Sequence, residues 1–92
     1  MAIEINLAQQ IACLKREIAL RKNVYPKFVH SDRMRQSEAD YEIAAMTAAL
    51  HSLTDLAEKR AADLWRKEHP DRSVFDCDEA EKDIYRNRAL VA

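Results

Sequence analysis

The stretch that decides the fold is residues 37–69, which read SEADYEIAAMTAALHSLTDLAEKRAADLWRKEH. Its apolar side chains recur at spacings of three and four residues, which is the period of one helix face. They are Ile43, Met46, Leu50, Leu53, Ala57 and Leu64. No glycine or proline interrupts the pattern before Pro70. The stretch therefore predicts a single helix of about 33 residues, roughly 50 Å long at 1.5 Å per residue.

Capping patterns mark where two of the helices begin. Ser37 can cap the first turn with its hydroxyl, and Asp40, three residues later, can return the bond, so we expect the long helix to start at Ser37. Asp76 and Glu79 repeat this spacing and predict a shorter helix over 77–91.

The segment 70–76 joins these two helices and starts with Pro70, which cannot continue a helix. We interpret the segment as a hinge. Val74 and Phe75 are expected to pin it to the hairpin through their apolar side chains.

The amino-terminal stretch has the same helical period. The apolar residues that share its face are Leu7, Ile11, Leu14 and Ile18. We predict a helix over 1–25 that ends at Pro26, because a proline ring disfavours helical backbone at the residue before it. The basic segment 26–36 is then a turn, and Asp32 is its residue best able to adopt left-handed backbone.

The fold class follows from these elements. The chain has no glycine and two prolines, so it lacks the residues that the tight turns of a sheet protein require. We predict one all-α domain over 1–92, in which the first two helices form an antiparallel, coiled-coil-like hairpin and a shorter helix follows. A chain this short buries only about 60–65% of its unfolded surface, so self-association would add to a thin core.

Charge is distributed unevenly along the chain, although the net charge is only -1. Residues 1–36 carry seven Lys and Arg against three Asp and Glu, and the remainder is net acidic. No apolar run approaches the roughly 20 residues of a membrane span, so we expect no membrane contact and a cytoplasmic location. Cys13 and Cys77 are expected to be reduced thiols that pack as small apolar groups.

No group of residues predicts catalysis or metal binding. The histidines and cysteines lack the spacing that brings several metal ligands together. The carboxylates of the long helix alternate with Lys and Arg as they do on a solvated face, and a chain without glycine has no glycine-rich phosphate loop. We therefore expect neither an enzyme nor a bound cofactor.

A basic surface with two aromatic residues gathers around the predicted turn. Its members are Lys15, Arg21, Lys22, Tyr25, Lys27, Phe28, Arg33 and Arg35. We predict that this surface contacts a partner protein. One alternative is that it meets nucleic-acid phosphates, and another is that the aromatics seal the end of the hairpin while the cations are only solvated.

A second candidate surface lies on the long helix. The stretch 43–50 is apolar nearly all the way round, so either the helix over 77–91 folds back over it or two hairpins pair across it. Trp65 is expected to pack in the core, although an exposed indole there would be the strongest interface residue. The candidate oligomer interface comprises Ala45, Ala49, Leu56 and Trp65.

Residues 17–29, EIALRKNVYPKFV, continued by Met34 and by residues 39–46, ADYEIAAM, resemble a group of small phage and prophage proteins. Members share an "ELALRxxVYPxxV … ADYEIAxM" motif, and the resemblance covers about residues 11–53. This chain has Asp32 where a glycine is usual and Arg35 where a capping threonine is common. The resemblance implies a phage origin and the host-cell cytoplasm. We expect a homodimer that binds a phage or host protein.

Overall fold

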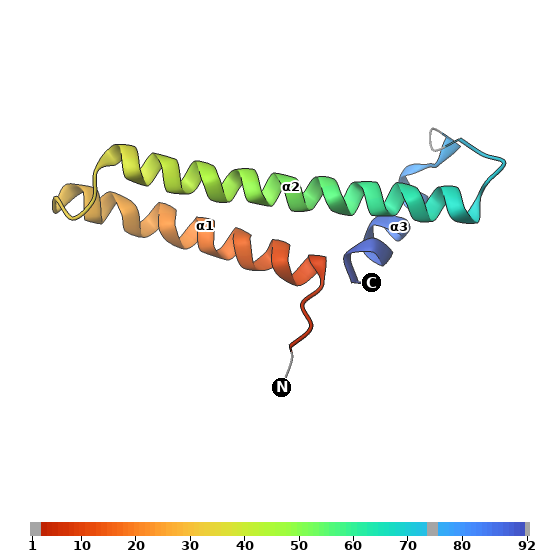
Figure 1. The fold of residues 1–92 in the computed structure, drawn as a ribbon, viewed down its shortest axis with the longest axis horizontal. Helices are drawn as coiled ribbons and strands as arrows, with labels where there is room; N and C mark the ends of the chain where they lie inside the picture. The colour runs from red at the N-terminus through yellow and green to blue at the C-terminus, as the bar shows by residue number, and fades with distance from the viewer. Residues whose placement is uncertain (1–2, 74–75, 92) are drawn as a thin grey trace.

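The computed structural model describes residues 3–73 and 76–91, and these residues form three helices: α1 (Leu7–His30), α2 (Gln36–Glu68) and α3 (Glu79–Val91). Figure 1 shows α1 and α2 side by side and antiparallel, with α3 packed against the far half of α2. The predicted all-α class, the antiparallel hairpin and the shorter carboxy-terminal helix are confirmed.

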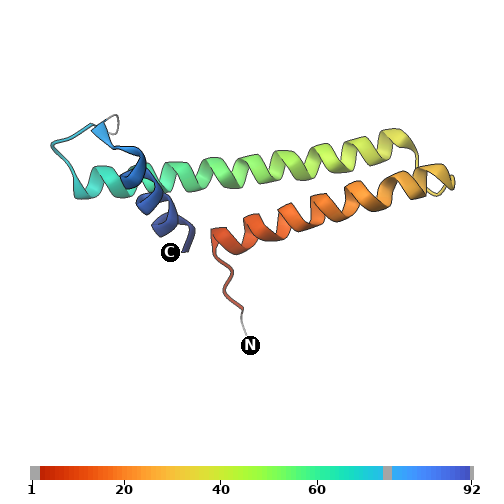
Figure 2. The same cartoon turned by 180° about the vertical axis from the view of Figure 1, so that it is seen from behind.

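The molecule is elongated, and α2 runs through most of its length. Its extents are 60 × 36 × 17 Å and its radius of gyration is 18.0 Å. A compact chain of 92 residues would have a radius of gyration of about 12 Å. Figure 2 shows α3 crossing α2 obliquely, with its end near the start of α1. The first part of α2 therefore packs against α1 and the last part against α3.

Two apolar stripes meet in the seam between α1 and α2. Leu7 and Ile18 of α1 and Ala39 and Ala57 of α2 are buried there. The other aliphatic residues of the seam are only half-buried: Ile11, Leu14, Ile43, Met46, Leu50 and Leu53. Two helices cannot enclose the side chains at the edges of their contact, so the seam keeps apolar surface accessible on its flanks.

α1 begins later than the predicted helix over 1–25. Asn6 caps it, since the Asn6 side chain accepts a hydrogen bond from the Gln9 N–H at 2.9 Å and the Gln9 side chain accepts from the Asn6 N–H at 2.9 Å. This reciprocal pair satisfies two amides that the first turn would otherwise leave unpaired.

Pro26 does not end α1, and that prediction is wrong. The helix continues through Pro26 to His30, and the turn predicted over 26–36 is shortened to residues 31–35. Proline fixes φ near its helical value, so the cost is the lost bond to the Lys22 carbonyl and local crowding, about 3 kcal/mol. Packing of the half-buried side chains in the following turn offsets this cost.

The turn itself follows the predicted role of Asp32, which adopts left-handed backbone with φ 61°. The Arg33 N–H donates to the Phe28 carbonyl at 2.9 Å and the Asp32 N–H donates to the Val29 carbonyl at 3.2 Å. These two bonds form the Schellman arrangement that closes many helices. An aspartate therefore occupies the position that glycine usually takes.

α2 starts at Gln36, one residue before the predicted start, and the predicted capping box at Ser37 does not form. Arg35 is the N-cap, in extended backbone and without a side-chain cap bond. Because the helix begins earlier, Ser37 already lies inside its first turn. Asp40 instead accepts a hydrogen bond from the Gln36 side chain at 2.9 Å.

α3 starts at Glu79, two residues later than predicted. The cap is Asp78, whose side chain accepts from the Glu81 N–H at 2.8 Å. Asp76, the predicted cap, accepts from the Ser73 N–H at 3.2 Å instead. An aspartate thus caps α3 as predicted, but it is Asp78 and not Asp76.

The connection over 70–76 contains a side-chain bond that closes it on itself, in which the Arg72 guanidinium donates to the Asp76 carbonyl at 3.0 Å. The expected contact of Val74 and Phe75 with the hairpin lies outside the described residues.

The alternative that the third helix folds back over 43–50 is wrong. α3 pairs with Glu58 and Glu68 in the last third of α2. Ala45 and Ala49 are accordingly exposed. The pairing of two hairpins across this stretch remains a prediction.

Candidate interaction surfaces

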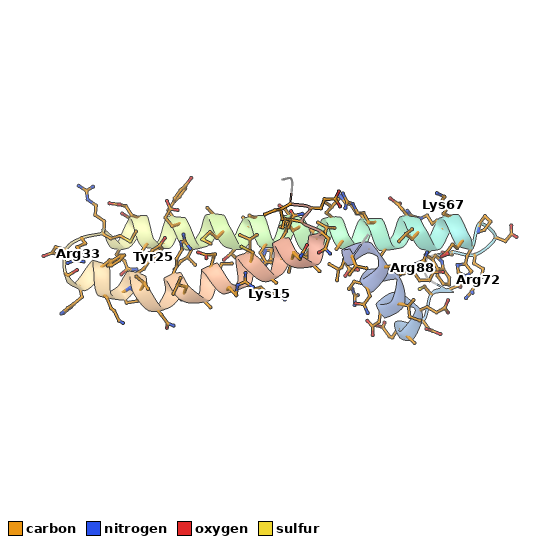
Figure 3. The ribbon with its side chains drawn as sticks, turned by 90° about the horizontal axis from the view of Figure 1, so that it is seen from below. Lys15, Tyr25, Arg33, Lys67, Arg72 and Arg88 are labelled. Carbon is orange, nitrogen blue, oxygen red and sulfur yellow. The ribbon has the colours of Figure 1, made fainter. Side chains whose placement is uncertain are left out.

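The end of the hairpin carries a group of exposed cations. We call Lys22, Lys27, Arg33 and Arg35 the basic tip, and all four side chains are exposed. Figure 3 shows Arg33 at the extreme end of the molecule. Arg35 lies 4.0 Å from Glu38, a distance at which an exposed pair contributes little. Lys22, Lys27 and Arg33 make no ion pair with any residue that the structure describes.

Three predicted contact residues have structural roles instead. Tyr25 and Phe28 are half-buried and continue the inward stripe of α1, so they close the end of the seam. Arg21 forms an ion pair with Glu17 one turn earlier. Its pKa is raised, first by the hydrogen bond to Glu17 and then by one to Tyr25. These three side chains support the tip but do not form its exposed surface.

Lys15 is exposed but does not belong to the tip. It lies near the middle of the hairpin (Figure 3), about 22 Å along α1 from His30 at 1.5 Å per residue. There it borders an apolar groove of about 320 Å³ where α1, α2 and the end of α3 meet.

A shallow groove runs across the tip, with a volume of about 460 Å³. Arg33 and Arg35 line it together with Asp32 and Glu38, and Val29 is also part of its wall. Cations, carboxylates and an apolar side chain thus share one small surface. This mixture is typical of protein interfaces, which combine an apolar centre with a polar rim.

The junction between α2 and α3 is centred on Trp65, which is only 1% exposed. His69 stacks on the indole with ring centroids 3.9 Å apart, and Tyr85 meets it edge-on at 5.5 Å. The Arg72 guanidinium lies 4.8 Å from the indole centroid. Core packing of Trp65 is confirmed, and this burial removes it from the surface that we predicted for oligomer contact.

Two ion pairs join α3 to α2 beside this aromatic cluster. Arg86 donates to Glu58 at 2.6 Å and Arg88 donates to Glu68 at 2.6 Å. These bonds raise the pKa of both arginines, and the bond to Arg88 is the first cause that lowers the pKa of Glu68. No local pattern in the sequence indicates these pairs, because their partners lie 28 and 20 positions apart.

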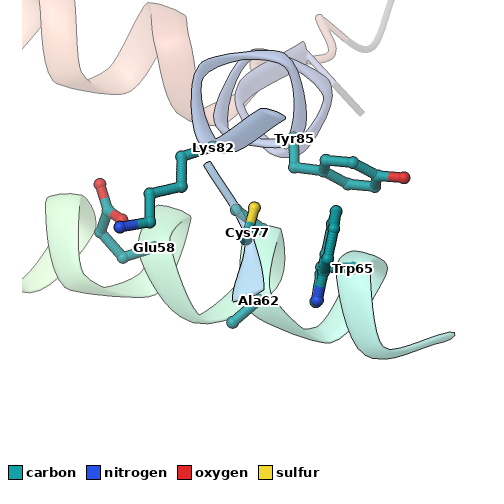
Figure 4. A pocket seen from close by; sticks show the side chains of 7 residues that line it. Glu58, Ala62, Trp65, Cys77, Lys82 and Tyr85 are labelled. Carbon is teal, nitrogen blue, oxygen red and sulfur yellow. The ribbon is translucent and has the colours of Figure 1, made fainter. Parts of the chain in front are cut away.

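Cys77 packs under α3 as predicted. Figure 4 shows its sulfur between α2 and α3, beside Trp65 and Tyr85, in a cavity of about 100 Å³. Burial, followed by the charges of Glu81 and Asp78, raises the pKa of the thiol. A raised pKa keeps the thiol protonated and unreactive.

Cys13 is exposed, so the expectation that it packs as an apolar group is wrong. It belongs to what we call the apolar flank, a set of accessible apolar residues along one side of the hairpin. The apolar flank consists of Cys13, Leu20, Ala45, Ala49 and Leu56. Leu20 is 55% exposed and Leu56 is 37% exposed. Three predicted interface residues thus lie together on an accessible surface.

Within residues 3–73 and 76–91, no group of three or more His, Cys, Asp or Glu side chains is placed to hold a metal ion. Over the same residues, no helix has both the length and the apolar character needed to cross a membrane. No family model, curated protein or solved structure matches the chain.

Proposed function

We propose that this chain is a phage- or prophage-type protein that acts in the host cytoplasm as a homodimer by binding another protein. The basic tip is the contact surface. The observation that carries the proposal is a groove lined by Arg33 and Arg35 together with carboxylates and Val29. Exposed Lys22 and Lys27, which make no ion pair with the described residues, lie on the last turns of α1 before it. The partner surface is acidic with an apolar centre.

The shape of the molecule supports this role. The tip lies at the end of a 60 Å rod, away from the α2–α3 junction (Figure 1). A partner can therefore approach it without displacing any helix. Arg21 and Tyr25 pack behind the tip and hold α1 in place, so the surface is preorganised and little ordering is needed on binding.

Capture experiments with the tagged full chain test the proposal. The Lys22→Glu, Arg33→Glu double variant should lose a partner that the wild type captures from lysogenic or infected cells. The matched control is Lys59→Glu, Lys67→Glu, which makes the same change in charge near the other end of α2. Mass spectrometry identifies the captured proteins. Equal capture by both double variants would remove the tip from the mechanism.

The alternative is an accessory factor that binds nucleic acid with the same cations. Its specific support is that Lys15, Arg16, Lys22 and Lys27 of α1 make no ion pair with the described residues. Binding to duplex DNA should then weaken steeply with salt, with a log–log slope of about 0.9 per phosphate contact. A chain that binds no DNA or RNA at low salt rules this alternative out.

A further inference from the structure

The chain exposes far more surface than its mass requires. Its accessible area is 7060 Å². A compact monomer of 10.6 kDa exposes about 5500 Å², so the excess is about 1600 Å². Much of the hairpin seam is also half-buried, as with Leu14, Met46 and Leu53. Apolar side chains in this position become fully buried only when a further layer of helices covers them.

The two broad faces of the hairpin differ. On one face Ala8 and Ala12 of α1 lie beside Thr54 and Glu58 of α2, and the end of α3 closes the groove with Leu90. With 3.6 residues per turn, Ala45, Ala49 and Leu56 fall on the other side of the seam from these residues, and Cys13 and Leu20 lie next to that face toward the outer side of α1. α3 therefore leaves the apolar flank open along the length of α1.

We infer that a second copy of this chain docks on the apolar flank. The two hairpins form a four-helix bundle whose twofold axis runs parallel to the helices. This arrangement rests on the proposed function and specifies its homodimer. Each α1 lies against the partner copy's α2, so every neighbouring helix pair in the bundle is antiparallel, as in many four-helix bundles.

Side-chain size is complementary in this arrangement. A twofold axis parallel to the helices keeps every residue at its own level along the bundle. The register of the hairpin, in which Ala12 lies beside Thr54, places Leu20 level with the stretch between Ala45 and Ala49. Leu20 of one copy then fills the shallow surface over the two alanines of the other copy. A large side chain facing small ones allows close helix packing.

Charge is complementary as well. α1 carries five Lys and Arg against one carboxylate, Glu17. At the tip end of the flank, α1 is level with the first turns of the facing α2, which carry Glu38 and Glu42. Pairing α1 with the acidic start of α2 in the other copy brings opposite charges together at the rim of the interface.

The available area is sufficient for a specific dimer. α1 has 24 residues, which gives a length of about 36 Å, and two helices side by side are about 20 Å wide. The covered face is then about 700 Å² per copy, close to the roughly 800 Å² per partner of standard interfaces.

Light scattering on the full chain tests this inference. The expected mass is twice 10.6 kDa. Ala49→Glu should weaken association by about tenfold or more, because it places an unpaired charge in the interface. The matched control is Ala48→Glu, which makes the same change at the neighbouring exposed alanine on the outer side of α2. A monomeric wild type, or equal effects of the two variants, overturns the inference.

Circular dichroism establishes that both variants remain helical. Should Ala49→Glu fail to fold, Leu20→Ala replaces it and Ile84→Ala becomes the control. Ile84 is 57% exposed, close to the 55% of Leu20, but it lies on α3 and not on the hairpin. Association should weaken for Leu20→Ala alone, and an equal loss with Ile84→Ala overturns the inference.

The relative orientation of the two hairpins can be measured by the distance between spin labels on their tips. Spin labels on Arg33→Cys in a Cys13→Ser background should lie about 20 Å apart, because both tips sit at the same end of a bundle two helices wide. Labels separated by the length of the hairpin overturn the parallel arrangement. Failure of partner capture at the tip leaves these results unaffected, and a monomeric chain leaves the capture experiment unaffected, so the two proposals fail separately.

Discussion

The α2–α3 junction and the α1–α2 seam enclose their apolar residues to different degrees. At the junction Trp65 is surrounded by His69, Tyr85 and Cys77, and two ion pairs close the edges. In the seam, long stripes meet but most of their aliphatic side chains stay half-buried. The junction encloses its core within one chain, whereas the seam needs a further layer.

The difference comes from side-chain size and from the number of elements that meet. One indole is almost completely buried among neighbours from α2, α3 and the connecting segment, with a cavity of only about 100 Å³ beside it. Over most of its length the seam has contributions from α1 and α2 alone, although the end of α3 reaches it beside Ala57. The buried positions of the seam on α2, Ala39 and Ala57, are small. We therefore expect substitutions at the junction to act within one chain and substitutions in the seam to depend on association.

The largest expected effect is that of Trp65→Ala. Removing a fully buried indole should lower the free energy of unfolding by about 3–5 kcal/mol. Urea unfolding followed by circular dichroism measures this loss. α3 should also detach more often, so the thiol of Cys77 should react faster with a maleimide than it does in the wild type.

Trp65→Phe is the control for this substitution. The indole Nε1 makes no hydrogen bond with the described residues, so phenylalanine removes volume but no polar contact. Its cost should be about 1 kcal/mol. Equal losses for the two variants would show that the indole does not hold the junction together.

The second prediction compares two leucines of the same helix. Leu53 lies in the seam and Leu64 beside α3, and both are half-buried. Each change to alanine should cost about 1–2 kcal/mol, below the range for fully buried leucines. Thermal unfolding at low and high protein concentration distinguishes the two variants, because association stabilises the folded chain by mass action. The cost of Leu53→Ala should rise with concentration and that of Leu64→Ala should stay constant; parallel behaviour would contradict the comparison.

The hairpin could be predicted from sequence because its signals are local. The repeat of Met46, Leu50 and Leu53 needs no knowledge of distant residues, and the left-handed position of Asp32 followed from the lack of glycine. The capping pair of Asn6 and Gln9 is a local signal of the same kind, three residues apart.

The errors concern interactions that local patterns do not contain. Pro26 disfavours a helix locally, yet tertiary packing keeps α1 intact beyond it. The position of α3 depends on Arg86 and Arg88 finding carboxylates in a distant part of α2. At the candidate tip, the sequence predicts the exposed cations and offers, as an alternative, that Tyr25 and Phe28 seal the hairpin, but only the structure shows the pairing of Arg21 with Glu17.

The smallest expected effect is a pH dependence at the junction. The bond from Arg88, followed by one from the Tyr85 hydroxyl, holds the pKa of Glu68 below its ordinary value of 4.5. A carboxyl whose pKa is lowered by folding stabilises the fold above that ordinary value, and the contribution is lost as the pH falls through the lowered pKa. α3 should therefore dock less firmly in acid.

Glu68→Gln isolates this contribution, because the amide can still accept a bond from Arg88 but does not titrate. The free energy of unfolding should be measured from neutral to acidic pH. Below the ordinary pKa of a glutamate it should decrease less steeply in Glu68→Gln than in the wild type. Glu38→Gln is the control at the other end of α2, where the distance to Arg35 is 4.0 Å and both side chains are well exposed. If the pH profiles of the free energy of unfolding coincide for Glu68→Gln and the wild type, the ion pair with Arg88 does not stabilise the docking of α3. Packing around Trp65 would then be the interaction that stabilises the junction.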